Sequence, residues 1–145
     1  MQALIHIDGG ARGNPGPAAA GVCITTLDGT EALYEAGYWL GEMTNNEAEY
    51  QGLLHALKAA KELGFDNIHV RSDSELMVKQ IKGEYRVKAA NLKPLFATAR
   101  ERLSGFPDWS IEHVRREKNK RADQLANMAM DARRDVIETT SASDQ

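Results

Sequence analysis

Blocks of apolar residues separated by polar turns predict strands at the start of the chain. Residues 3–8 (ALIHID) are a short apolar run that ends in an acid, which predicts a buried strand. Residues 9–17 are rich in Gly, Pro and Asn and predict a loop. Two longer apolar runs, residues 18–27 and 31–40, flank an Asp-Gly pair that is typical of hairpin turns. We therefore expect three strands before the first helix.

The rest of the chain mixes helical and strand periodicity. Helices are expected at about 44–63, 74–81, 89–103 and 119–134, and strands at 67–72 and 109–114. The order β-β-β-α-β-α-α-β-α predicts an α/β fold with a five-stranded mixed sheet, in which three antiparallel strands precede parallel β-α units and helices cover both faces. Residues 1–134 would form a single domain, and the polar residues 135–145 a frayed C-terminal tail.

Composition narrows the class of protein without naming a function. The chain has 145 residues, of which 42% are hydrophobic and 27% charged, as in ordinary globular domains. No apolar run is long enough to span a membrane, so no membrane partner is expected. The N-terminus lacks the regions of a signal peptide. The single cysteine, Cys23, lies in an apolar run and predicts a buried, reduced thiol in a cytoplasmic protein. No long apolar surface stripe is evident, so we expect a monomer without an obligate protein partner.

The charge distribution leaves a nucleic-acid partner open. The formal net charge of −3 argues weakly against such a partner. Basic residues nevertheless gather at 115–121 and, more loosely, at 82–93. A run of like charge is usually a solvated face, so these runs gain meaning only if the acids near them have a chemical role.

Two glutamates, Glu47 and Glu49, stand at the start of the helix expected from Thr44. At about a hundred degrees per residue, Glu47 faces away from the apolar side, whereas Glu49 heads it. The other members of that apolar stripe are Leu53, Ala56, Ala60 and Leu63. Thr44 and Glu47 fit a capping box, which explains Glu47 structurally. Because a carboxylate on an apolar stripe costs free energy unless it is paired, Glu49 is either half of an ion pair or a metal ligand.

Three further acids occupy positions where strands end or helices begin. Asp8 ends the first predicted strand, Asp73 lies at a strand-to-helix junction, and Asp123 is in the first turn of the last helix. Each has a structural explanation when taken singly. Asp8 suits an Asx-type turn, residues 72–75 fit a capping box around Asp73, and the helix dipole favours Asp123 after Asn119 as N-cap.

Taken together, the four acids predict a different kind of site. In a mixed sheet, Asp8, Glu49, Asp73 and Asp123 can converge on one edge, where they would repel one another unless cations bound them. An all-oxygen ligand set suits Mg²⁺ or Mn²⁺. Two such ions about 4 Å apart form a phosphoryl-transfer site.

Four stretches of the chain resemble the motifs of type 1 ribonuclease H, in the order and at the spacing of that family. They are DGGARGNPGPAAAG at 8–21, TNNEAEY at 44–50, SDSELMVKQI at 72–81 and NKRADQLAN at 119–127. The resemblance covers about residues 1–130. It implies the ribonuclease H-like fold and hydrolysis of the RNA strand of an RNA–DNA hybrid by two Mg²⁺ ions, with Mn²⁺ as a possible substitute. The products would carry 5′-phosphate and 3′-hydroxyl ends.

The resemblance also implies roles for individual residues. Asp8, Glu49, Asp73 and Asp123 match the metal-binding acids, with Asp8 bridging both ions. Asn14 and Thr44 match positions that hold a phosphate of the DNA strand. Minor-groove contacts match Gly9, Gly10, Asn45 and Asn46. The asparagines also have purely structural explanations, since asparagine is favoured at helix starts and in turns.

The chain departs from the family pattern in three places. Glu75 stands where many members carry glutamine. No histidine-bearing loop of the family's H-x-G-H type precedes the last acid; His113 lies in a predicted strand, and Arg115 or Arg116 could handle protons or phosphate instead. Residues 82–93 are too few for the family's basic protrusion, which predicts a compact form. Two alternatives stay open: a nuclease of the same fold that prefers double-stranded RNA, and a catalytically silent hybrid-binding protein.

Overall fold

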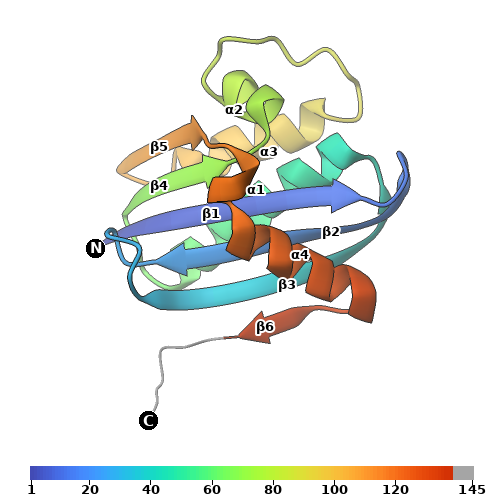
Figure 1. Ribbon diagram of the computed structural model, residues 1–145. Helices are drawn as coiled ribbons and strands as arrows, with labels where there is room; N and C mark the ends of the chain where they lie inside the picture. Colours follow the sequence, from blue (N-terminus) through green and yellow to red (C-terminus); the bar gives the residue numbers. More distant parts are fainter. Residues whose placement is uncertain (139–145) are drawn as a thin grey trace.

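The computed structural model describes residues 1–138 as a mixed sheet with helices on both faces (Figure 1). The strands are β1 Gln2–Ala11, β2 Gly16–Thr25, β3 Ala32–Met43, β4 Asn67–Ser72, β5 Asp108–His113 and β6 Val136–Glu138. The helices are α1 Asn45–Glu62, α2 Glu75–Ile81, α3 Lys93–Leu103 and α4 Lys120–Ala132, with a 3-10 turn, η1, at Arg116–Lys118. The predicted α/β class and the order of elements through α4 are confirmed.

The sheet has the strand order β5-β4-β1-β2-β3-β6, so β1 lies near its centre. β2 pairs antiparallel with β1 and β3, while β4 runs parallel to β1 and β5 parallel to β4. The predicted arrangement of a hairpin followed by parallel β-α units is therefore correct. A parallel strand next to β1 brings the carboxyl ends of β1 and β4 to the same edge of the sheet.

The sheet has six strands, and the prediction of five was wrong. β6 pairs antiparallel with β3, with Ile137 opposite Ala36. Three residues are too few to show an alternating pattern, so this strand could not be predicted from the sequence. The tail predicted from residue 135 is thus wrong for 136–138, and its remaining residues, 139–145, lie outside the described part of the chain.

Two other boundaries differ from the sequence expectation. β1 continues through Gly9 and Gly10 to Ala11, which pairs with Ala18, so the predicted loop at 9–17 shrinks to residues 12–15. Small residues have low strand propensity, but here they extend a ladder already formed by the apolar part of β1. α3 begins at Lys93 rather than at residue 89, and residues 82–92 connect α2 to α3 without a helix. This connection is as short as the predicted compact form requires.

The main core lies between the sheet and the three helices α1, α2 and α3, while α4 packs alone on the opposite face (Figure 1). The central side chains of the main core include Ile5, Ile7, Leu53, Leu57 and Ile68, all almost fully buried. α4 presents a strip of small and apolar residues to the other face, namely Ala122, Leu125, Ala126, Ala129 and Met130. None of the helices within residues 1–138 combines the length and apolar character needed to cross a bilayer.

Candidate active site

Asp8 and Asp73 lie side by side because of the register between β1 and β4. The last parallel pair of these strands is Ile7 with Ser72, and each acid is the next residue along its own strand direction. The ladder between the strands ends there, so both carboxyls stand at its open end. Asp8 does not end its strand, as the sequence suggested, but continues the pairing with β2 opposite Gly21. The Asp8 carboxylate accepts a hydrogen bond from the Gly9 amide at 2.9 Å.

Glu49 comes to the same place from the second turn of α1. This helix lies so close to β1 that a methyl group at Gly9 would clash with the Ala48 carbonyl. A glycine is required at that position for the approach of the two backbones. The Ser74 hydroxyl donates a hydrogen bond of 2.8 Å to Glu49 Oε1, which joins α1 to the start of α2. Glu49 therefore has a neutral partner rather than the basic partner that the structural reading required.

Glu47, by contrast, closes the predicted capping box. The Thr44 amide donates to Glu47 Oε1 at 2.9 Å, and the Glu47 amide donates to the Thr44 hydroxyl at 3.2 Å. The hydrogen bond from the Thr44 amide is the main cause that lowers the pKa of Glu47. The helix-phase distinction between the two glutamates is confirmed in their surroundings.

Asp123 reaches the site from the opposite face of the sheet, on the first turn of α4. α4 lies against β2 at Gly21, where a methyl group would clash with the Ala122 carbonyl. Because Gly21 pairs with Asp8, this close approach brings Asp123 beside Asp8, and the interaction with Asp123 helps to raise the pKa of Asp8.

The four acids line one cavity of about 680 Å³, and all four are half-buried. The convergence predicted from strand ends and helix starts therefore occurs. The remaining lining residues are Gly9, Gly10, Ala11, Arg12, Asn45, Asn46, Arg116, Ala126, Asn127 and Met130. Within residues 1–138, none of the four acids forms an ion pair with a basic side chain.

The acids lack basic partners, and the pKa values of two of them are raised. Burial and then repulsion by Asp73 and Asp123 raise the pKa of Asp8 to about 8. Burial is also the main cause that raises the pKa of Glu49 to about 7, against a lowering by the Ser74 hydrogen bond. At neutral pH the cavity thus holds carboxyl groups whose full ionisation is opposed by their own neighbours, a conflict that a bound cation relieves.

The donor set suits a hard divalent ion, although no closed cage is present. Within residues 1–138, no three His, Cys, Asp or Glu side chains stand close enough to enclose a metal by themselves. Mg²⁺ is usually bound by a few carboxylates together with water and substrate phosphate, rather than by a cage built entirely from protein. An open cavity whose four acids form no ion pair within residues 1–138 therefore fits that ion.

The residues matched to substrate contacts gather around the loop between β1 and β2 and the start of α1. Gly9, Gly10, Asn45 and Asn46 line the cavity, whereas Asn14 and Thr44 lie beside it. Asn14 Oδ1 accepts from the Asn45 amide at 3.0 Å, and Asn45 Oδ1 accepts from the Ala11 amide at 2.7 Å. These hydrogen bonds fix the loop against α1, so the two asparagines also have a structural task.

Of the three basic residues that the sequence offered for proton or phosphate traffic, Arg116 alone lines the cavity. Arg115 precedes η1 and is exposed. His113 ends β5, is exposed, and lies near enough to Glu75 to affect the pKa of that acid. Glu75 itself pairs with Lys79 at 3.1 Å, one turn further along α2.

Sequence reasoning missed two buried side chains that join the elements carrying the acids. Ser74, and not Ser72, is the N-cap of α2, since its hydroxyl accepts from the Met77 amide. The capping box predicted for residues 72–75 is therefore wrong. Asn119 occupies the N-cap position of α4, as expected, but its side chain makes no capping hydrogen bond. Its Nδ2 donates instead to the Ile7 carbonyl at 2.7 Å.

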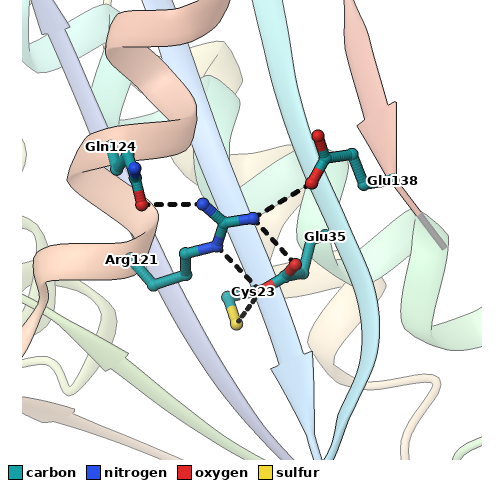
Figure 2. Close-up of polar contacts among 5 residues, drawn as sticks. All are labelled: Cys23, Glu35, Arg121, Gln124 and Glu138. Carbon is teal, nitrogen blue, oxygen red and sulfur yellow. Dashed lines mark hydrogen bonds and ion pairs between the residues drawn. The ribbon is translucent and has the colours of Figure 1, made fainter. Parts of the chain in front are cut away.

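A second polar cluster lies on the same side of the sheet, next to the first turn of α4 (Figure 2). Arg121 Nε and Nη2 each donate to Glu35 on β3 at 2.9 Å, and Nη2 also contacts Glu138 on β6 at 3.1 Å. The Cys23 thiol donates to Glu35 at 3.6 Å and is buried, as predicted. Here the acid has its own cation, and the Arg121 hydrogen bonds lower the pKa of Glu35.

Comparison with known proteins agrees with the fold. The family model described as "Reverse transcriptase-like" matches residues 6–129. The chain is 48% identical over 126 residues to ribonuclease HI of Halobacterium salinarum, covering 87% of this chain and 63% of that protein. The chain also spans 36% of the length of its mycobacterial relatives.

Solved structures give the same result in three dimensions. RNase H1 from Halobacterium salinarum superposes with a TM-score of 0.88 at 46% identity, over 91% of this chain and 99% of that one. LC11-RNase H1 in complex with an RNA/DNA hybrid superposes with a TM-score of 0.86 at 43% identity, over 90% and 98% of the two chains.

The fold and the cavity together define an α/β protein of the ribonuclease H-like class. Its sheet order, its four acid-bearing elements and the matched sequence extend over nearly all of the described residues. The chain belongs to the type 1 ribonuclease H family, and its short α2–α3 connection places it among the compact forms.

Proposed function

We propose that this chain is an endoribonuclease that hydrolyses the RNA strand of RNA–DNA hybrids, leaving 5′-phosphate and 3′-hydroxyl ends. One observation carries the proposal: four half-buried carboxyl groups from four different elements line one cavity without a basic partner among residues 1–138. Family membership supports the reaction, and the hybrid bound to the relative LC11-RNase H1 supports the substrate.

Asp8, Glu49, Asp73 and Asp123 would hold two divalent ions. When bound, two Mg²⁺ ions, or Mn²⁺ in their place, supply positive charge at the reacting phosphate and activate water for attack. Asp8 is the acid best suited to contact both ions, because its pKa responds to both Asp73 and Asp123. The pKa of Glu49 responds to Asp73, which puts Glu49 on that side of the cavity.

The substrate would lie across the loop between β1 and β2 and the start of α1. The backbone at Gly9 and Gly10 has no side chain to keep a ribose at a distance, so it can approach the 2′-hydroxyl that distinguishes RNA from DNA. Asn45 and Asn46 are exposed at the cavity and would contact the minor groove. Asn14 and Thr44, beside the cavity, would hold a phosphate of the DNA strand.

Arg116 would contact phosphate at the cavity. Its guanidinium can donate several hydrogen bonds to a phosphate but is a poor proton carrier. Because His113 and Arg115 do not line the cavity, Arg116 is the stronger candidate for this task. We further propose that the protein is a cytoplasmic monomer. The buried, free Cys23 supports the cytoplasmic location, because it suits a reducing compartment.

The proposal is tested with purified protein, Mg²⁺, and three end-labelled duplexes of one sequence: RNA–DNA hybrid, double-stranded RNA and DNA. We expect cleavage of the RNA strand of the hybrid, no cleavage of the DNA, and loss of all activity in Asp73→Asn. Hybrid binding without cleavage, in both Mg²⁺ and Mn²⁺, would contradict the enzymatic proposal. Preferential cleavage of the double-stranded RNA would contradict the substrate.

The neighbouring glutamates provide a matched pair of variants for the same assay. Glu49→Gln removes a cavity carboxylate and should lower kcat by about a thousandfold or more. Glu47→Gln removes an acid two positions away in the same helix turn, so it should cost about 1 kcal/mol of stability through the capping box and leave cleavage nearly intact. Equal loss of activity in both folded variants would refute the assignment of Glu49.

A further inference from the structure

Asn119 connects the two elements that carry Asp8 and Asp123. Its side chain is 1% exposed, and its Nδ2 donates a 2.7 Å hydrogen bond to the carbonyl of Ile7, the residue before Asp8. Its own backbone carbonyl accepts from the Asp123 amide at 3.1 Å. One residue therefore binds the chain next to the first acid and the backbone of the second.

The Ile7 carbonyl lies where the ladder between β1 and β4 ends, and it needs a hydrogen-bond donor from another segment. Ile7 pairs with Ser72, the last residue of β4, so the ladder between β1 and β4 stops at this position. A buried carbonyl at the end of a ladder must be satisfied by another group. Asn119 provides that donor from the sheet face that α4 covers. This hydrogen bond fixes where the first turn of α4 meets β1.

This use of Asn119 comes at a local cost. An asparagine at the start of a helix usually accepts a hydrogen bond from the helix amides, but Asn119 makes no such bond. Its buried Oδ1 has no hydrogen-bond partner among the described residues. A residue selected for stability alone would leave neither the helix uncapped nor an acceptor unsatisfied, so the arrangement calls for another explanation.

We propose that Asn119 is a positioning residue, which sets the distance between the Asp8 and Asp123 carboxyl groups and thus their capacity to bind divalent ions together. These carboxyl groups come from a strand and a helix on different chain segments, and both line the same cavity. The inference rests on the proposed function for its effect on catalysis, although its effect on ion binding can be measured without cleavage.

Two variants of Asn119 separate positioning from packing. Asn119→Ala removes the amide and leaves a space, whereas Asn119→Leu removes the hydrogen bond and keeps the side-chain volume. Both should lower kcat on the hybrid and the Mg²⁺ affinity measured by titration calorimetry without substrate by about 10- to 100-fold. The KM for the hybrid should stay within about threefold, since the groove residues are unchanged. Asn119→Leu should melt at a higher temperature than Asn119→Ala.

Tyr50→Phe is the matched control. The Tyr50 hydroxyl donates a buried 2.7 Å hydrogen bond to Gln80, which joins α1 to α2, and neither partner of this hydrogen bond is one of the four acids. We expect a melting temperature lowered to a similar degree, with unchanged kcat and unchanged Mg²⁺ affinity, when all proteins are assayed well below their melting temperatures. If Asn119→Ala does not fold, Asn119→Leu carries the test.

Wild-type kcat and wild-type Mg²⁺ affinity in the folded Asn119 variants would overturn the inference. Losses in Tyr50→Phe as large as those in the Asn119 variants would overturn it as well, because they would reflect general loosening. A wild-type protein that binds Mg²⁺ but does not cut hybrid would refute the proposed function alone. The calorimetric comparison of Asn119 variants would then still decide whether this residue positions the acids.

Discussion

α4 takes part in two clusters of acidic side chains that differ in what balances their negative charge. In the cluster of Figure 2, Glu35 receives two hydrogen bonds from Arg121, and the pKa of Glu35 is lowered. In the cavity, Asp8 faces Asp73 and Asp123, and the pKa of Asp8 is raised to about 8. α4 contributes to both clusters, through Arg121 and Asp123, so the contrast depends on whether an acid has a basic partner as well as on its burial, which is the main cause of the raised pKa of Asp8.

The presence or absence of a basic partner indicates which acids stabilise the fold and which are available to bind a ligand. A buried acid with its own arginine is complete within the protein, and breaking the pair leaves an unbalanced charge. Acids that repel one another have no such use for stability and become favourable only when an external cation joins them. The cavity thus trades stability for the capacity to bind metal, as functional sites often do.

Neutralising one acid in each cluster is the strongest way to test this contrast. Asp8→Asn should lower hybrid cleavage by about a thousandfold or more, because it removes the carboxylate shared by the proposed ions. Its melting temperature without metal should equal or exceed that of the wild type, since the substitution removes repulsion. Initial rates on the labelled hybrid and thermal unfolding in EDTA measure the two effects.

Glu35→Gln should show the opposite profile. It leaves Arg121 without its main partner and should cost about 1–3 kcal/mol of unfolding free energy, while kcat stays near the wild-type value. Urea unfolding followed by circular dichroism gives the free energy. The contrast fails if Glu35→Gln abolishes cleavage in a folded protein, or if Asp8→Asn is the more destabilised of the two.

Much of this contrast could be predicted from the sequence, because it depends on local patterns. Helix phase placed Glu49 on the buried stripe and left Glu47 to the cap, and strand ends indicated Asp8 and Asp73 as neighbours. The links made by Ser74 and Asn119 could not be predicted, since each depends on register and packing between segments far apart in the chain. Capping rules favoured Ser72 over Ser74, which caps α2 and binds Glu49 as well. For Asn119, the tertiary hydrogen bond to Ile7 replaced the expected local cap.

The same reasoning explains why the edge of the sheet was misjudged. β6 is three residues long, and it is held by pairing with β3 and by the Arg121–Glu138 contact. The loop after β1 was predicted to be too long, since Gly9 and Gly10 read as turn residues. They lie in β1 because both pair with β2, and Gly9 in addition lets α1 come close to the backbone.

The two clusters should also respond to pH in opposite directions. The pKa of Asp8 rises from 3.8 to about 8 on folding, so the folded state binds the extra proton over that range. The free energy of unfolding of the metal-free protein should therefore fall as pH rises from about 4 towards 8, by at most about 1.4 kcal/mol per pH unit for one proton. Glu35, whose pKa is lowered on folding, contributes stability above its ordinary pKa that is lost as pH falls through the lower folded value.

Urea unfolding across this pH range, with EDTA or with excess Mg²⁺, separates the two contributions. Mg²⁺ should restore the stability lost at high pH, because it binds the folded protein in preference to the unfolded one. Asp8→Asn should show a smaller decline, because the raised pKa of Glu49 still contributes to it, and a weaker rescue by Mg²⁺. Glu35→Gln should keep both effects at full size and lose less stability in acid than the wild type does. A decline of equal size in Asp8→Asn would assign it to other groups.

The smallest expected effect concerns Glu138, which shares Arg121 with Glu35. Its side chain is 46% exposed, against 10% for that of Glu35, so water screens its 3.1 Å contact with the guanidinium. Glu138→Gln should change the unfolding free energy by about 0–1 kcal/mol and leave kcat and Mg²⁺ affinity unchanged. A loss as large as that in Glu35→Gln would mean that β6 holds Arg121 in place, and the cluster would then depend on the sheet edge rather than on the buried pair.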